Sequence, residues 1–190
     1  MVWLLWLGTF IINKVRIIGG THRSRTIHFP DSDGLRPTPD RVRETLFNWL
    51  GQTLYGKRCL DLFAGSGALG FEAASRGAAE VVLVESNRAV FRALQDNAQK
   101  LALGNVALHC EDGLKFAAQA NGAFDVVFLD PPFQSDYLSR LLPRLADLLA
   151  PGGVVYAESG SAFDPGADWQ ILKQGKAGAV NYRLMAHKEE

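Results

Sequence analysis

The residues best suited to chemistry are Asp130, Pro131, Pro132 and Phe133, which directly follow the apolar run Val126–Leu129. A proline has a fixed φ and no backbone N–H, so two prolines end the strand in a rigid turn. The turn places a carboxylate, free carbonyl oxygens and an aromatic ring at the carboxyl end of a strand, where open α/β sheets bind ligands. This predicts a platform for a planar base that carries an amine. A loop with a helix-capping acid is the alternative.

A glycine-rich loop, Gly65-Ser-Gly67-Ala-Leu-Gly70, lies between a strand-like run and a helix-like run. It matches G-x-G-x-x-G, in which glycines let the backbone approach a cofactor closely and amides meet its negative charge. Glu85 follows the first glycine by about twenty residues, the position from which an acid binds ribose hydroxyls. The pattern alone allows a nicotinamide dinucleotide, and it also occurs as a tight turn that only packs a helix on a strand.

Two further acids favour a different cofactor. Asp61 lies four residues before Gly65, so its carboxylate is expected to point into the cleft near the loop. There it would repel a pyrophosphate and attract the ammonium group of an amino acid. Asp112 follows the third predicted strand, where it could accept a hydrogen bond from an adenine amino group. S-adenosylmethionine carries both the ammonium and the adenine and has no phosphate, so we expect it in preference to a dinucleotide.

From residue 57 onward, strand and helix patterns alternate, which indicates βαβ units and a mostly parallel sheet. The predicted strands are 57–63, 80–85, 106–110, 124–129 and 153–158, and the predicted helices are 68–76, 87–103, 113–120 and 137–149. Residues 169–174 and 180–187 predict an antiparallel hairpin, which completes seven strands. We therefore expect an α/β, Rossmann-like domain over residues 35–190, without internal repeats or a linker.

A small basic β-hairpin is predicted before this domain, with strands over Val15–Ile18 and Thr21–Phe29 across a Gly19-Gly20 turn. Residues 14–44 carry seven Lys or Arg against four Asp or Glu, whereas residues 45–190 carry thirteen against sixteen. A basic arm on a mildly acidic body suggests a polyanionic partner. A solvated hairpin is the alternative.

A helix with a strong start follows the hairpin. Thr38 predicts an N-cap with Pro39 at the first helical position, and apolar residues then recur at helical spacing up to Leu50. On this helix, Arg41 and Arg43 predict either contact with a ligand or a solvated face.

The composition indicates one sizeable core, because 47% of the 190 residues are hydrophobic and the formal net charge is zero. Cys59 and Cys110 lie in apolar runs and predict small core residues of a reducing compartment. No Cys/His cluster has ligand spacing, so we expect no metal. The apolar start, Met1–Ile12, is too short to span a bilayer and lacks the features of a secretory signal. We expect a cytoplasmic protein in which residues 1–34 comprise this start and the hairpin.

Together these motifs resemble the class I S-adenosylmethionine-dependent methyltransferases and, within them, the RsmD family. The resemblance is carried by Arg16-Ile-Ile-Gly-Gly20, Leu35-Arg-Pro-Thr38, Asp40–Leu50, Asp61–Gly70 and Asp130–Phe133. It runs from about Val15 to the end of the chain, and Leu35–Leu50 is its most specific part. RsmD enzymes are bacterial and methylate the exocyclic N2 of a guanine in small-subunit (16S) ribosomal RNA. Met1–Asn13 departs from the polar start that is usual in the family.

The resemblance implies that Asp130–Phe133 receives the target base. It also implies a site for S-adenosyl-L-methionine, made of Asp61, Phe63, Ala64, Gly65, Gly67, Gly70, Glu85, Ser86, Asp112, Gly113 and Thr38. The candidate RNA-binding residues are Lys14, Arg16, Arg23, Arg25, Arg36 and Arg41. Of these two sets, Arg36, Thr38 and Arg41 either close the cofactor pocket or meet RNA phosphate. The expected partner of a monomeric protein is small-subunit ribosomal RNA or an assembling 30S particle.

The expected mechanism positions an amine whose lone pair is delocalised into the purine ring. Hydrogen bonds to Asp130 and a Pro131 carbonyl would direct the lone pair at the methyl group, and Phe133 would stack on a base turned out of its helix or loop. Asp130 either accepts the proton or only positions the amine. Three alternatives stay open: an adenine-N6 methyltransferase acting on DNA or another RNA, an NAD-dependent oxidoreductase, and a non-catalytic RNA-binding module.

Overall fold

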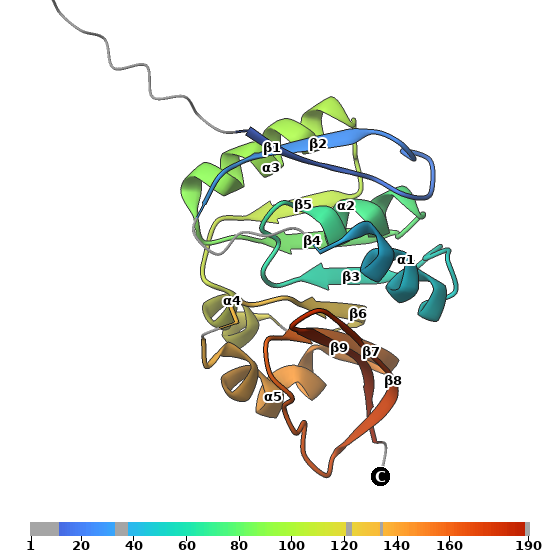
Figure 1. The fold of residues 1–190 in the computed structure, drawn as a ribbon, viewed down its shortest axis with the longest axis vertical. Helices are drawn as coiled ribbons and strands as arrows, with labels where there is room; N and C mark the ends of the chain where they lie inside the picture. The colour runs from blue at the N-terminus through green and yellow to red at the C-terminus, as the bar shows by residue number, and fades with distance from the viewer. Residues whose placement is uncertain (1–11, 33–37, 121–122, 134, 189–190) are drawn as a thin grey trace, which may run out of the picture.

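A mixed seven-stranded sheet lies at the centre of the computed structural model, which describes residues 12–32, 38–120, 123–133 and 135–188 (Figure 1). In spatial order its strands are β5 (Val106–His109), β4 (Glu80–Val84), β3 (Arg58–Asp61), β6 (Phe124–Leu129), β7 (Leu149–Ser159), β9 (Val180–His187) and β8 (Trp169–Ala177). The strands from β5 to β7 run parallel to one another. Strand β9 pairs antiparallel with β7, and β8 pairs antiparallel with β9. The predicted Rossmann-like class I methyltransferase fold, with its antiparallel C-terminal hairpin, is confirmed.

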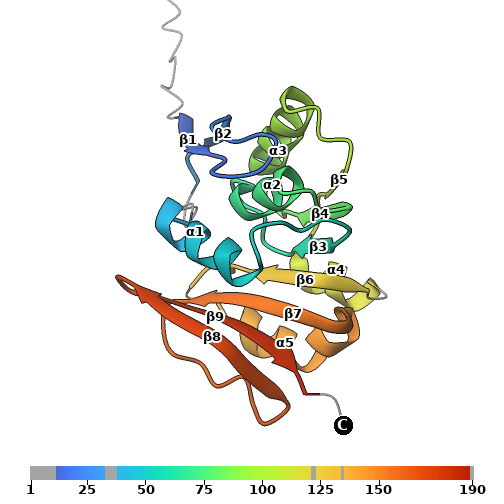
Figure 2. The ribbon, with the colours of Figure 1, turned by 90° about the vertical axis from the view of Figure 1, so that its right-hand side faces the viewer.

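Helices cover both faces of the sheet (Figure 2). One face packs against α1 (Asp40–Trp49), α2 (Ala68–Ser75) and α3 (Arg88–Lys100), and the other against α4 (Gly113–Gln119) and α5 (Tyr137–Leu148). Along β6, Val126 and Phe128 join the first core, whereas Val127 and Leu129 join the second. Successive side chains of a strand point to opposite faces, so a strand that is covered on both sides is apolar at every position.

The basic hairpin is a separate two-stranded sheet of β1 (Ile12–Arg16) and β2 (Thr26–Pro30), fixed on α3. The Asn97 amide of α3 acts as a strand partner: it donates to the His28 carbonyl at 2.7 Å and accepts from the His28 N–H at 3.1 Å. Val15 and Ile27 are buried in the same core as α1 to α3. The hairpin is therefore an integral layer over the helices.

The turn of this hairpin is longer than predicted. Strand β1 already ends at Arg16 and Thr21–Ser24 form a turn, so the predicted strands over Val15–Ile18 and Thr21–Phe29 are both wrong next to the turn. Gly20 has a φ of +74°, and a Cβ there would lie 1.9 Å from the carbonyl oxygen of Ser75 on α2. Because of this close approach the chain continues as a turn against α2 before it can pair again.

The N-cap of α1 is Pro39, so the predicted N-cap at Thr38 is wrong. The Pro39 carbonyl accepts from the N–H groups of Val42 and Arg43 at 2.9 and 3.1 Å. Thr38 is buried, and its hydroxyl donates to Glu158 at 2.9 Å. A hydroxyl that caps a helix accepts from the first backbone N–H groups of that helix. The Thr38 hydroxyl instead bonds to the Glu158 carboxylate, which is distant in sequence.

Arg43 joins α1 to α2 and to the hairpin through a buried network, so the predicted alternative of a solvated face is wrong for this residue. Its guanidinium contacts Asp40 at 2.5 Å and Glu72 at 3.4 Å. It also donates to the carbonyl oxygens of Thr38 at 3.2 Å and Arg16 at 2.9 Å. A buried charge with two carboxylates and two carbonyls around it is well compensated.

The remaining differences from prediction lie at the ends of elements and at one cysteine. The predicted helix over 87–103 ends at Lys100, and the fifth strand of the parallel set begins four residues early, at Leu149. Cys59 is buried as predicted, and burial raises its thiol pKa to about 12, whereas Cys110 is exposed. In the described part of the chain, no helix has the length and apolar character to cross a membrane. Residues 1–11 of the apolar start lie outside the described residues.

Replacing Arg43 by Met should strongly destabilise the fold, because Glu72 and Asp40 would lose their buried cation. Removing one partner of a buried pair costs about 3–5 kcal/mol. The matched control is Arg140→Met, since Arg140 forms an exposed pair with Asp136 that is worth about 1 kcal/mol or less. Urea unfolding measures both variants. Equal losses in the two would contradict a structural role for the Arg43 network.

Candidate active site

Three acids meet at the carboxyl edge of the sheet, because each stands where a parallel strand ends. Asp61 is the last residue of β3, Asp130 follows β6, and Glu158 is the penultimate residue of β7. The pairing register sets Asp61 opposite Phe128 and Leu129 opposite Ala157, so the acids follow on adjacent strands. Asp61 and Asp130 were predicted as site residues, whereas Glu158 was not.

Asp61 has the most confined carboxyl group of the three. Its Oδ2 accepts a hydrogen bond from the Gly70 N–H at 3.1 Å. Its Oδ1 is fully buried, and no described residue donates to it. Burial raises the pKa of Asp61 to about 7, although the neighbouring Gly70 and Phe63 backbones oppose that rise. This orphaned oxygen suits a ligand that brings a cationic donor.

The glycine loop forms a tight turn that packs α2 on the sheet, and its role in binding a cofactor stays a prediction. Gly67 is the N-cap of α2 with a φ of +80°, and a Cβ there would lie 2.5 Å from the Phe71 ring. A Cβ on Gly70 would meet the Leu83 side chain at 2.8 Å, so this glycine lets α2 lie close against β4. Glu85 holds the loop by accepting from the Gly65 N–H at 2.9 Å. The loop is a compact cradle at the end of β3.

Asp112 follows β5, and both of its carboxylate oxygens accept hydrogen bonds. Its Oδ1 caps α4 by accepting from the N–H groups of Leu114 and Lys115, and its Oδ2 accepts from the Tyr137 hydroxyl at 3.0 Å. The Phe63 ring lies 4.9 Å from the Tyr137 ring, edge to face. Tyr137 was not predicted as a site residue. It lies at the start of α5, and only the packing of α5 beside α4 brings its hydroxyl to Asp112. Among the remaining predicted cofactor residues, Ala64 and Gly113 are buried and Ser86 is exposed.

A buried hydrogen-bond network connects Asp130 with Glu158. The Thr38 hydroxyl lies 2.9 Å from Glu158 Oε1 and 3.4 Å from Asp130 Oδ2. The Tyr156 hydroxyl donates to the same Glu158 oxygen at 2.8 Å. Burial, followed by the charges of Glu158 and Asp61, raises the pKa of Asp130 well above its usual range. Burial also raises the pKa of Glu158, and the hydrogen bonds from Tyr156 and Thr38 oppose that rise.

The turn after Asp130 lines a pocket of about 170 Å³ with its residues Pro131, Pro132 and Phe133, beside the end of β7 and the start of α5. Glu158 and Phe163 also line it. The Phe133 side chain is half exposed. The Pro132 carbonyl is occupied by the backbone N–H and the hydroxyl of Ser135, at 3.0 and 2.6 Å. Of the two proline carbonyls, Pro131's is the one that no described residue occupies.

The predicted RNA-binding residues divide into two groups. Lys14, Arg23, Arg25 and Arg41 are exposed and have no acidic partner within the described ranges. Arg16 is also exposed but is paired with Asp40 at 2.8 Å. Arg36 lies outside the described residues. A groove of about 420 Å³ between the hairpin and α1 is lined by Lys14, Arg16 and Thr38, among others.

The charge of the site distinguishes among cofactors. Asp61, Glu85, Asp112, Asp130 and Glu158 all lie at the strand ends, and none has a Lys or Arg partner within the part of the chain that the structure describes. No group of His, Cys, Asp and Glu in that part has the arrangement of a metal site. Such an edge repels a pyrophosphate and attracts an ammonium or a sulfonium. The residues present therefore fit S-adenosylmethionine.

The sheet order, the glycine loop and the Asp-Pro-Pro-Phe turn define a class I methyltransferase. The comparisons agree on a narrower group: residues 15–186 match the family described as conserved hypothetical protein 95. The chain belongs to this family, which is the RsmD family of methyltransferases.

Named relatives and solved structures support this assignment. The ribosomal RNA small subunit methyltransferase D of Escherichia coli is 45% identical over 177 residues, which are 90% of this chain and 89% of that protein. The protein of the same name from Haemophilus influenzae is 40% identical over 179 residues, 90% of this chain and 93% of its own. The solved structure of Escherichia coli yhhF superimposes with a TM-score of 0.84 at 41% identity and covers 93% of this chain and 99% of its own.

The raised pKa of Asp61 predicts a specific pH dependence of stability for the ligand-free protein. The unfolded chain releases this proton near pH 3.9 but the native protein near pH 7, so the native state binds it more tightly. The free energy of unfolding should therefore fall as the pH rises from about 4 to about 7. Asp61→Asn cannot titrate and should lose this part of the decline. Urea unfolding at pH 4.5 and pH 8 compares the two proteins. Removing the Asp61 charge also lessens the rise in the pKa of Asp130, which reduces the decline of the variant in the same direction. Identical declines would contradict the raised pKa.

Proposed function

We propose that the protein transfers a methyl group from S-adenosyl-L-methionine to the exocyclic N2 amine of one guanine in small-subunit ribosomal RNA. The observation that carries this proposal is the Asp130–Phe133 turn beside an edge of unneutralised acids and a glycine cradle. The names of the relatives that cover about nine-tenths of the chain support ribosomal RNA as the substrate.

The cofactor is held by residues at the ends of β3, β4 and β5. The Asp61 carboxyl binds the ammonium group of its methionine part. The carboxylate of that part is bound by loop amides other than those of Gly65, Gly67 and Gly70, which already donate to Glu85, Ala64 and Asp61. Glu85 binds the ribose hydroxyls and Asp112 the adenine amine, beside the Phe63 ring. When bound, the cofactor supplies an electrophilic methyl group on a sulfonium.

Asp130 and the Pro131 carbonyl hold the amine of the target base. Each accepts one N–H, which fixes the nitrogen in the direction of the methyl group and favours its lone pair for attack. The Phe133 ring, half exposed at the mouth of the pocket, stacks on a base that has turned out of the RNA. The raised pKa of Asp130 makes its carboxylate a better acceptor for the proton that the amine loses after transfer.

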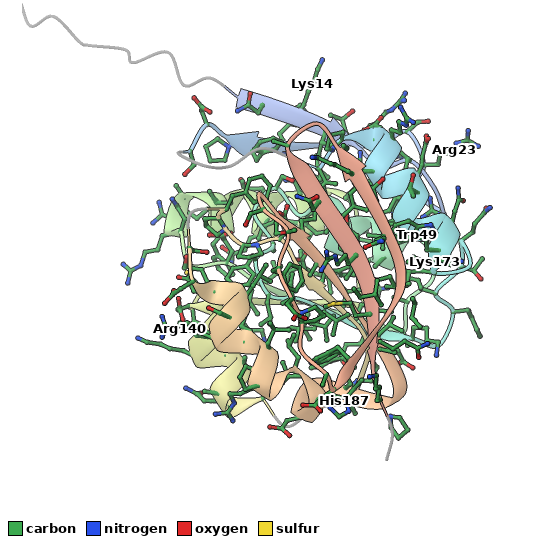
Figure 3. The ribbon with its side chains drawn as sticks, turned by 60° about the horizontal axis from the view of Figure 1, so that its bottom comes forward. Lys14, Arg23, Trp49, Arg140, Lys173 and His187 are labelled. Carbon is green, nitrogen blue, oxygen red and sulfur yellow. The ribbon has the colours of Figure 1, made fainter. Side chains whose placement is uncertain are left out.

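The RNA backbone is bound by the basic hairpin and the groove next to it. Lys14 and Arg23 extend outward from this part of the molecule (Figure 3). The groove reaches from Lys14 to Thr38, whose hydroxyl contacts the Asp130–Glu158 pair, so it connects the hairpin with the reacting end of the sheet. Phosphate contacts position the RNA without reading its sequence. The substrate is the RNA itself or an assembling 30S particle in the cytoplasm, bound by a monomer.

Asp130→Ala should lower methyl transfer by about 100-fold or more, because the amine loses both its position and its proton acceptor. Binding of S-adenosylhomocysteine should stay within a few-fold of the wild type. The control is Asp96→Ala, an exposed residue on α3 that should leave both properties unchanged. Transfer is measured with labelled cofactor and binding by calorimetry. Loss of cofactor binding in Asp130→Ala would contradict the proposal, because it would show that Asp130 belongs to the cofactor site and not to the site of the target base.

Replacing Lys14, Arg23 and Arg25 by Gln should weaken RNA binding and reduce the slope of log affinity against log salt by about 2 to 3, since each phosphate contact contributes just under one unit. Replacing Lys173, Lys176 and Lys188 by Gln makes the same charge change at the far edge of the sheet and should leave the slope unchanged. Equal effects of the two triple variants would show a diffuse charge effect and not a hairpin interface.

Nucleoside analysis of the methylated RNA tests the reaction itself. Label from S-adenosylmethionine should appear in N2-methylguanosine at one site of small-subunit ribosomal RNA, either free or in partly assembled particles. Label in N6-methyladenosine would keep the chemistry and overturn the choice of base. The absence of label from every RNA, with cofactor binding intact, would overturn the proposal.

A further inference from the structure

We propose that Glu158 selects guanine over other amine-bearing bases by accepting a hydrogen bond from guanine N1–H, while Asp130 holds the neighbouring N2 amine. This inference rests on the proposed function and names the residue that decides its substrate.

Glu158 lies beside Asp130, where its carboxyl group can contact the Watson–Crick edge of a base whose amine is bound to Asp130. It follows Ala157, which pairs with Leu129 on the adjacent parallel strand, so Glu158 and Asp130 leave the sheet side by side. The Thr38 hydroxyl lies within 3.4 Å of one oxygen from each acid. Glu158 also lines the pocket that Pro131–Phe133 line. A base stacked on Phe133 with its amine on Asp130 would thus present its edge to Glu158.

The hydrogen bonds of Glu158 orient it for this role. Tyr156 and Thr38 both donate to Oε1, at 2.8 and 2.9 Å. No described residue donates to Oε2, although the residue is only 2% exposed. Two neutral donors stabilise the charged form, because they lower the pKa that burial raises. The side chain is therefore locked with one oxygen satisfied and the other available as an acceptor at the pocket.

Such an acceptor fits guanine and rejects adenine. The Watson–Crick edge of guanine carries two adjacent donors, N1–H and the N2 amine, and two neighbouring carboxyl groups can accept one from each. Adenine has an amine beside an unprotonated N1, whose lone pair would face the Glu158 oxygen. A buried carboxylate opposite an acceptor loses a hydrogen bond and adds a repulsion. The Asp-Pro-Pro-Phe turn alone recognises an amine on a planar base, so Glu158 supplies the information that the turn lacks.

The first test uses the wild-type protein and an RNA in which the target guanine is replaced by 2-aminopurine. This base keeps the N2 amine but has an unprotonated N1, like adenine. The expected result is a loss of about 10- to 100-fold in kcat/KM for the amine of 2-aminopurine, the range of discrimination of one good base contact. Equal kcat/KM values for guanine and 2-aminopurine would overturn the inference and leave the proposed function standing. No methylation of the guanine RNA would instead overturn the proposed function.

The second test is Glu158→Gln, in which Tyr156 and Thr38 should hold the amide oxygen in the place of Oε1. The NH₂ group then faces the pocket and can donate to the N1 of 2-aminopurine. The ratio of kcat/KM for guanine to that for 2-aminopurine should therefore fall by at least 10-fold and can invert. A purely structural or proton-accepting role would lower both values together and leave the ratio unchanged, which would overturn the inference.

The control variant is Glu80→Gln, at the start of β4 on the opposite edge of the sheet, where Glu80 pairs with Arg58. It should keep the wild-type ratio. Binding of S-adenosylhomocysteine to Glu158→Gln confirms that the variant is folded. If it is not, the wild-type comparison still decides the question.

Discussion

The active site depends on one electrostatic constraint: carboxyl groups are buried at the carboxyl edge of the sheet with no described Lys or Arg to neutralise them. Burying an ion without a partner costs several kcal/mol, so these acids are stabilised by neutral donors and by raised pKa values. The Gly70 N–H serves Asp61, and the Thr38 and Tyr156 hydroxyls serve Glu158. The negative charge left over is what a cationic cofactor and an amine substrate complement.

The helix α1 links this edge to the hairpin. Arg43 donates to the carbonyl of Thr38 on one side and to the carbonyl of Arg16 on the other, with Glu72 and Asp40 balancing its charge. The residue that contacts the Asp130–Glu158 pair and the strand proposed to bind RNA are thus held by a single guanidinium. The proposed function requires a fixed distance between the surface that positions the RNA and the pocket that receives one base, and this buried ion provides it.

Much of the fold could be predicted because parallel strands that are covered on both faces are apolar throughout, and because glycines and prolines mark their ends. The helix at 68–75 and the strand at 124–129 follow from such patterns. Thr38 was misread because a hydroxyl before a helix usually caps it, and only the buried carboxylate of Glu158, 120 residues away, competes for it here. Glu158 was missed although an acid also ends the apolar run Val154–Ala157. An acid at the end of an apolar run also indicated Asp61 and Asp130. Those two acids adjoin a recognisable motif, whereas Glu158 does not.

The sequence by itself determined the class of fold, the glycine loop, the rigid turn after β6 and the acids at the ends of β3 and β6, because each depends on a local pattern of residue types. The tertiary structure alone decided which residues surround the turn. β6 and β7 are joined by a helix and pair side by side, so Asp130 and Glu158 meet although 28 positions separate them. Arg43 likewise became buried only when α1 packed against α2 and the hairpin. Long-range pairing places these charges together, and no local pattern encodes it.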